Sequence, residues 1–151
     1  MRTRHRGVGL LLGLLSALTL SLVSTAPASA STSTSTSTST WTLEAEGQRI
    51  CVGPEYGWPN TYAFAAVSGS WSTPIQVGVR NLPPGSSSLG GSTIPPGTNE
   101  RDPDDGGLVV NGFVGLSLAP APAGEYHAEI WATDGKQTQT DQLLLDYKYG
   151  C

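Results

Sequence analysis

Residues 116–135, LSLAPAPAGEYHAEIWATDG, decide the fold that we expect for this chain. Apolar and polar residues alternate up to a Pro-rich corner, and a second alternating run begins at Tyr126. Such alternation predicts β-strands, and the Asp134-Gly135 pair predicts a tight turn after the second strand. A tyrosine that starts a strand just after a corner is typical of a tyrosine corner, whose hydroxyl hydrogen-bonds back across the preceding loop of a β-sandwich.

Other segments of the chain also have the period of strands. They lie around residues 41–51, 62–69, 71–80, 108–119 and 143–149. No segment of this part has the spacing of an amphipathic helix, so the sequence predicts an all-β domain, an antiparallel β-sandwich of about six to eight strands. In the segment 62–69 both phases are apolar, which favours a central strand that is covered on both faces.

Residues 81–107 have no periodicity and contain several Pro-Gly and Gly-Gly pairs. These pairs predict turns, so we expect one long loop, with 92–94 as a short edge strand inside it. Long loops in compact domains are usually functional or disordered. A shorter loop is expected at 53–60, which contains two glycines and two prolines.

The N-terminus has the three parts of a secretory signal peptide. Three arginines lie within the first six residues, residues 10–23 are Leu-rich, and Ala28-Ser29-Ala30 fits a cleavage site. The expected organisation is a signal peptide (1–30), a flexible linker of five Ser-Thr pairs (31–40) and a β-sandwich domain (41–151). We therefore expect a secreted, extracellular protein with no membrane span in its mature form.

The charge of the expected mature chain narrows the class of partner. Loss of the leader removes three arginines, which leaves five basic and twelve acidic residues and a formal net charge of −7. An acidic surface repels phosphate groups, so nucleic acids and anionic membranes are poor partners.

Cys51 and Cys151 are the only cysteines in the sequence. An even number of cysteines in an exported protein favours a disulfide. This bond would close a loop of about a hundred residues and stabilise the fold by about 4–5 kcal/mol in the chain-entropy model. A metal pair or a reactive thiol is the alternative, but no neighbouring His or Cys supports either.

These residues carry two resemblances. The run from Leu116 through the Pro-Ala-Gly corner to Tyr126 resembles the tyrosine-corner segment of fibronectin type III and immunoglobulin-like domains, which implies an immunoglobulin-like β-sandwich. Ala128 stands where the immunoglobulin version has a cysteine, so the antibody-type core disulfide is absent. The chain also resembles small exported actinobacterial proteins of a family of unknown function, which implies secretion and a disulfide but no activity. The motifs that carry this second resemblance are CVGPEYG (51–57), WSTPIQVGV (71–79), GSTIPPGTNE (91–100) and APAPAGEYHAEIWATDG (119–135).

Two groups of residues have the composition of a metal site. Asp102, Asp104 and Asp105 cluster on one turn and supply the hard oxygen ligands that calcium needs, but their spacing fails the EF-hand pattern. His127 and Glu129 share one strand face, but no further ligands accompany them. We expect a solvated acidic turn, a surface histidine, and neither metal nor cofactor.

The sequence singles out no catalytic residues. It contains no nucleophile elbow, and the expected mature chain has one His to act as a base. Glycoside hydrolysis requires two facing carboxylates, and none of the acidic residues stands out as such a pair. We therefore expect that the protein is not an enzyme.

Three aromatic residues are candidate ligand contacts. Tyr56 and Trp58 lie in the expected loop, and the phase of its strand turns Trp131 away from the core. Exposed aromatic rings stack on sugars or anchor protein partners. The structural alternative is that Trp131 packs under the loop 81–107 and Trp58 covers one end of the sandwich.

Together, these features favour a secreted, monomeric, non-catalytic module that binds an extracellular protein or a glycan. One alternative is a protease inhibitor that presents the loop 81–107 on a rigid scaffold, because a preorganised loop loses little entropy on binding. The other alternative is a carbohydrate-binding module that uses the exposed aromatic residues.

Overall fold

The computed structural model describes residues 40–151, which contain eleven β-strands and no helix. The strands are β1 (Trp41–Glu44), β2 (Gln48–Val52), β3 (Trp58–Phe64), β4 (Ala66–Trp71), β5 (Ile75–Arg80), β6 (Ser87–Gly91), β7 (Thr93–Ile94), β8 (Gly97–Asn99), β9 (Phe113–Leu118), β10 (Gly124–Thr133) and β11 (Thr138–Tyr147). The predicted all-β class is confirmed, although the strands are more numerous than we expected. The expected signal peptide lies outside the described residues, as does the expected linker apart from Thr40.

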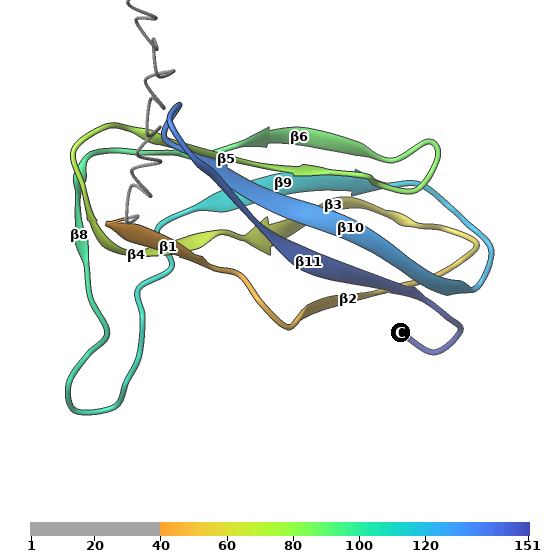
Figure 1. The fold of residues 1–151 in the computed structure, drawn as a ribbon. Coiled ribbons are helices and arrows are strands. Elements are labelled where there is room, and N and C mark those ends of the chain that lie inside the picture. Colours follow the sequence, from red (N-terminus) through yellow and green to blue (C-terminus); the bar gives the residue numbers. More distant parts are fainter. Residues whose placement is uncertain (1–39) are drawn as a thin grey trace, which may run out of the picture. The chain divides into compact units, whose positions relative to one another are not determined.

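The strands form three sheets, with the orders β1-β4-β8, β2-β11-β10-β5-β7 and β3-β9-β6 (Figure 1). The long β10–β11 hairpin is the centre of the five-stranded sheet. β2 lies parallel to β11, so that Ile50 is opposite Leu145, whereas every other strand pair in this part of the chain is antiparallel. The expectation of a wholly antiparallel domain is therefore wrong at this edge.

The inner faces of the three sheets enclose one hydrophobic core. Its largest fully buried side chains are Trp41, Val52, Val67, Ile75, Val114, Leu116, Leu118, Ile130, Leu143, Leu145 and Tyr147. Tyr147 brings a polar atom into this core, and its hydroxyl donates to the carbonyl of Ala119 at 3.0 Å. Burial raises the pKa of that hydroxyl, so it stays protonated and keeps its donor function.

The stretch 116–135 folds as its pattern predicts. β9 ends at Leu118, β10 begins after the Pro-rich corner, and the hydroxyl of Tyr126 donates to the carbonyl of Pro122 at 3.1 Å. The ring of Tyr126 also packs edge-on against Tyr147, with 5.1 Å between the ring centroids. The predicted hairpin turn at Asp134-Gly135 is confirmed, and Gly135 has the positive φ of +85° that this turn requires.

The expected central strand at 62–69 is in fact divided between two sheets. β3 ends at Phe64, β4 begins at Ala66, and the intervening Ala65 donates its N–H to the carbonyl of Gly112 at 2.9 Å. The outward residues of β3 are not covered, since Tyr62 and Phe64 are exposed. Two apolar phases therefore mark an apolar surface on β3, and not a doubly buried strand.

The first predicted strand is also divided. β1 ends at Glu44, a turn with positive φ follows at Gly47, and β2 belongs to a different sheet. Cys51 does not share the buried phase of β1, because Val52 is the fully buried residue of β2.

The expected long loop at 81–107 is wrong. It contains β6, β7 and β8, each paired to a different sheet, and only the predicted edge strand at Thr93–Ile94 is confirmed. Its glycines permit close packing: a Cβ on Gly91 would lie 1.8 Å from the carbonyl oxygen of Val77. The strand expected from residue 108 begins only at Phe113, which leaves 100–112 as the extended loop of this region.

Candidate functional site

The outer face of the β3-β9-β6 sheet carries three aromatic rings in mutual contact, which we call the aromatic triad: Tyr62, Phe64 and Phe113. Their ring centroids are 5.4 Å apart for Tyr62 and Phe64, 5.7 Å for Phe64 and Phe113, and 6.1 Å for Tyr62 and Phe113. The exposed fractions are 56%, 40% and 44%, respectively. The triad is therefore an apolar surface in water, which a globular protein usually covers or uses.

Strand geometry explains why these rings meet. Tyr62 and Phe64 are two residues apart on β3, so both side chains point to the same face. Phe113 is directly opposite Phe64 in the antiparallel pair with β9, and Gly115 is opposite Tyr62. Because Gly115 has no side chain, Leu89 of β6 packs over this position beside Tyr62.

Trp58 extends the aromatic surface to the start of β3. Trp58 is 47% exposed. The register of the β3–β9 pair shifts between Trp58 and Thr61. Together with Tyr62 and Phe64, Trp58 lines a groove of about 600 Å³ along the adjacent edges of β2 and β3, a size typical of sites for small ligands. The other residues that line this groove are Gln48, Arg49, Ile50, Cys51, Gly53, Asn60, Thr61 and Cys151.

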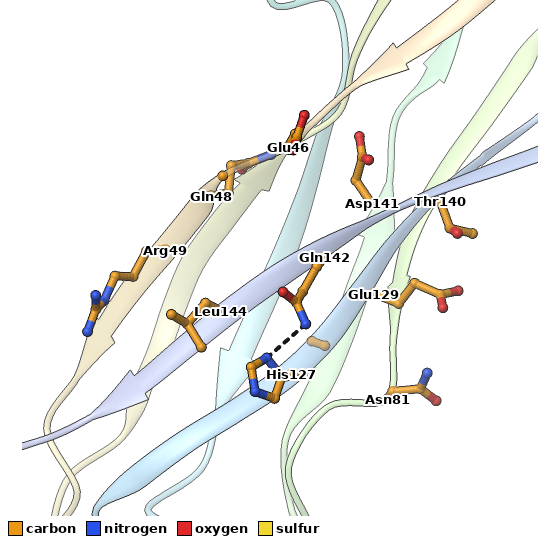
Figure 2. Close-up of a pocket in the computed structure, with 12 residues that line it drawn as sticks. Glu46, Gln48, Arg49, Asn81, His127, Glu129, Thr140, Asp141, Gln142 and Leu144 are labelled. Atoms are coloured by element: carbon orange, nitrogen blue, oxygen red, sulfur yellow. Dashed lines mark hydrogen bonds between the residues drawn. The ribbon is translucent and has the colours of Figure 1, made fainter.

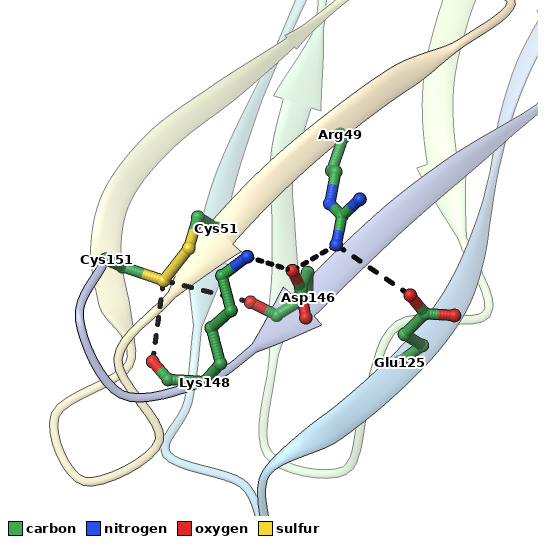
Figure 3. Close-up of a disulfide and its surroundings, with 6 residues drawn as sticks. All are labelled: Arg49, Cys51, Glu125, Asp146, Lys148 and Cys151. Carbon is green, nitrogen blue, oxygen red and sulfur yellow. Dashed lines mark hydrogen bonds and ion pairs between the residues drawn. A yellow bond between two sulfur atoms is a disulfide. The ribbon is translucent and has the colours of Figure 1, made fainter.

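The disulfide between Cys51 and Cys151 borders the groove and confirms the predicted pairing. The two Cα atoms are 5.6 Å apart, within the usual range for a disulfide. The bond fixes one end of β2 to the segment that follows β11 (Figure 3). One wall of the groove is therefore covalently held.

Arg49 is the one charged residue among those that line the groove, and acidic groups neutralise it. Its guanidinium pairs with Asp146 and lies 3.8 Å from a carboxylate oxygen of Glu125 (Figure 3). Lys148 also donates to Asp146, at 2.7 Å. Hydrogen bonds from Lys148 and Arg49 hold the pKa of Asp146 below its usual range, and Asp146 in turn raises the pKa of Arg49. The groove therefore has little net charge.

A second, polar groove of about 780 Å³ lies on the outer face of β10 and β11 (Figure 2). There His127 Nδ1 pairs with the side-chain amide of Gln142 at 2.9 Å, and Glu129 forms an ion pair with Arg80. Asp141 accepts the N–H of Ala45 at 2.8 Å. These polar groups are already paired with other groups of the protein. The strand face that carries His127 and Glu129 therefore resembles an ordinary polar surface of a β-sheet.

The acidic turn uses its carboxylates to hold its own backbone. Asp102 accepts the N–H of Asp104 at 2.8 Å, and Asp105 accepts the N–H of Gly107 at 2.7 Å. All three aspartates of the turn are exposed. Within residues 40–151, no three His, Cys, Asp or Glu side chains come together in a group that could hold a metal ion.

The three predicted contact residues do not form one site. Trp58 lies on β3 and not in a loop, and it joins the aromatic surface. Tyr56 is 83% exposed in the turn that Gly53 and Gly57 close. Trp131 is half-buried on β10, where it covers Gly78 so closely that a Cβ there would lie 2.3 Å from the indole.

The sequence interpretation missed the aromatic triad. Its signal is the second apolar phase of 62–66, for which the sequence predicts a buried face. Phe113 lies within the strand expected at 108–119, but nothing local in the sequence marks it as a partner of Phe64. The pairing that brings Phe113 to Phe64 depends on strand register, which the sequence does not show.

Comparison with known proteins gives a family for the chain. A family described as "Family of unknown function (DUF5980)" matches residues 42–149 and so spans all three sheets. The chain belongs to this family. The predicted resemblance to a family of unknown function is thereby confirmed, whereas the immunoglobulin-like resemblance stays a prediction. No curated protein and no solved structure matches the chain significantly. A search of the described residues for a helix able to cross a membrane found none.

Proposed function

We propose that the protein is a secreted, non-catalytic β-sandwich module that binds an extracellular ligand through the aromatic triad and Trp58. One observation carries the proposal: the triad exposes three contacting aromatic rings on one sheet face, beside a groove. The three sheets around one core support the sandwich, and the disulfide fits an oxidising compartment.

The physics of recognition favours this surface. Aromatic residues bury a large area and lose little side-chain entropy, so they dominate the energy of many interfaces. β3 and β9 hold the rings in a fixed register, which preorganises the surface for a ligand. The groove offers no His and no pair of carboxylates, so the same residues suit binding better than acid–base chemistry.

The test is a retention assay with the oxidised protein, expressed from residue 1, on two sets of probes: immobilised polysaccharides and an array of peptides. The triple variant Tyr62→Ala, Phe64→Ala, Phe113→Ala removes the triad. Val109→Ser is the matched control, because Val109 is 69% exposed in the loop 100–112. We expect retention on at least one probe to be lost only in the triple variant. Equal retention of both variants, or no retention on any probe, would refute the proposal.

The non-catalytic part has its own test. The wild-type protein is incubated with chromogenic glycoside, ester and peptide substrates, and product is measured over a day. We expect no turnover. Turnover that His127→Ala or Glu129→Gln abolishes would instead assign an enzymatic function to the polar groove.

A further inference from the structure

We infer that the ligand is a neutral glycan chain that stacks on Trp58 and the aromatic triad and lies along the groove between β2 and β3. This inference rests on the proposed function and specifies its ligand. A sugar ring has an apolar face of C–H groups and a rim of hydroxyl groups, so its site needs aromatic rings and neutral polar groups side by side. The groove contains both.

The polar groups of the groove are available to a ligand. Asn60 and Thr61 line the groove next to Trp58, and neither side chain has a hydrogen-bond partner within residues 40–151. Gln48, by contrast, is already paired with the backbone of Phe64. The amide of Asn60 and the hydroxyl of Thr61, two residues that line the groove, match the donors and acceptors of sugar hydroxyls.

The arrangement of the rings selects the form of the glycan. The ring planes of the triad cross at 62° to 76°, so they do not make a flat platform. A flat crystalline polysaccharide surface would contact one ring at most. A single chain, whose successive sugars turn relative to one another, can place different sugar faces against differently oriented rings.

Charge selects a neutral chain over an anionic one. Arg49 is the one cation among the residues that line the groove, and Asp146 and Glu125 neutralise it (Figure 3). The expected mature chain carries a net charge of −7, which repels uronate-rich and phosphate-rich polymers. A neutral ligand has no ionic groups, so its entry into the groove carries no free-energy cost for removing water from a charge.

The edge of β3 disfavours the other main class of ligand, an extended peptide. A peptide that adds to a sheet edge needs a continuous row of backbone N–H and C=O groups. The side-chain amide of Gln48 occupies both backbone groups of Phe64, at 2.8 and 2.9 Å. The row is therefore blocked at the end of β3, within the aromatic triad itself.

The test is isothermal titration calorimetry of the oxidised protein with four hexasaccharide probes. Cellohexaose, chitohexaose and mannohexaose are neutral, and hexagalacturonate is anionic. We expect at least one neutral probe to bind, and hexagalacturonate to show no binding. The double variant Asn60→Ala, Thr61→Val should weaken the neutral probe about tenfold, because it removes two hydrogen-bonding groups, and Val109→Ser should leave the affinity unchanged.

The outcomes separate this inference from the proposed function. If no neutral hexasaccharide binds, or if hexagalacturonate binds as well, the inference is wrong. Triad-dependent retention on the peptide array in that case would still support the proposed function. If a neutral probe binds but the Asn60/Thr61 variant keeps wild-type affinity, the glycan does not lie in the groove and the inference fails in that form.

Discussion

The side-chain amide of Gln48 pairs with the backbone of Phe64 in both directions. The N–H of Phe64 donates to Gln48 Oε1 at 2.8 Å, and Gln48 Nε2 donates to the carbonyl of Phe64 at 2.9 Å. The same Nε2 also donates to the carbonyl of Ala45 at 3.0 Å. One side chain of β2 thus acts like a residue of a neighbouring strand and links two sheets that share no backbone ladder.

We predict that Gln48→Ala lowers the free energy of unfolding by about 1–3 kcal/mol, because it leaves the backbone groups of Phe64 without these partners. Urea denaturation followed by tryptophan fluorescence measures the change. Gln76→Ala is the control, since Gln76 is an exposed residue of β5. Equal effects of the two substitutions would show that the link between the sheets contributes no stability.

The disulfide should be the largest single contribution to stability. Cys51 and Cys151 are separated by 100 residues, so their bond restricts the unfolded chain strongly. The double variant Cys51→Ser, Cys151→Ser should lose about 4–5 kcal/mol in the chain-entropy model. The denaturation midpoint of the wild type in reducing agent should match that of the double variant in its absence. A midpoint that the reducing agent does not move would contradict the prediction.

Gly78 should tolerate no side chain while Trp131 is present. A Cβ on Gly78 would lie 2.3 Å from the indole ring, so Gly78→Ala should destabilise the fold by about 1–3 kcal/mol. Trp131→Ala should relieve most of this effect, which a double-mutant cycle of unfolding free energies measures. Gly53→Ala is the matched control, because nothing lies within 4 Å of its Cβ position. Additive effects at Gly78 and Trp131 would refute the contact.

Substitutions of a buried residue and of an exposed residue of β9 should lower the free energy of unfolding by different amounts. Leu116 is fully buried, so Leu116→Ala should cost about 2–5 kcal/mol, whereas Phe113→Ser should cost no more than about 1.5 kcal/mol, the value of its ring contacts. Thermal denaturation of both variants measures this contrast. A loss at Phe113 as large as that at Leu116 would make the triad a structural cluster and remove its functional interpretation.

The carboxylate of Asp134 should stabilise the fold at neutral pH and should lose this effect at acidic pH. Its carboxylate accepts the N–H of Gln137 at 2.9 Å and the indole N–H of Trp41 at 3.0 Å, and these bonds, with that from Gln137 the strongest, hold its pKa below the usual range. Since the folded-state pKa lies below the unfolded value of about 3.9, the stabilisation is complete above that value and is lost as the pH falls through the folded-state pKa.

The variant Asp134→Asn tests this pH dependence. Relative to wild type, it should lose stability at about pH 7, and this loss should shrink as the pH falls through the folded-state pKa of Asp134, because the wild-type side chain then becomes neutral as well. Unfolding free energies across this range give the difference curve. A constant difference at all pH values would mean that the geometry of the side chain, and not its charge, stabilises the turn.

The sequence predicted those elements whose signals are local. The β10–β11 hairpin follows from alternation and from the Asp134-Gly135 turn, and both are confirmed. The disulfide followed from the even number of cysteines in a chain expected to be exported, and it is confirmed.

The elements that were missed depend on contacts far apart in the chain. β6 and β8 consist mainly of Ser, Gly, Thr and Asn, so they lack the apolar alternation that identifies a strand, and their partners β9 and β4 define them. Tyr149 continues the apolar phase of β11 within the strand expected around 143–149, but β11 ends at Tyr147 and Tyr149 is 73% exposed. Phase alone does not show where a strand ends.

The parallel pairing of β2 with β11 has a consequence for the order in which the protein assembles. During synthesis, β2 is made early, but its only ladder partner is the strand made last among those described. Ile50 and Val52 therefore have no partner strand until the segment that contains Leu145 and Tyr147 has been synthesised. Such distant closure makes folding slow, because the entropy of closing a long loop is lost before these contacts form.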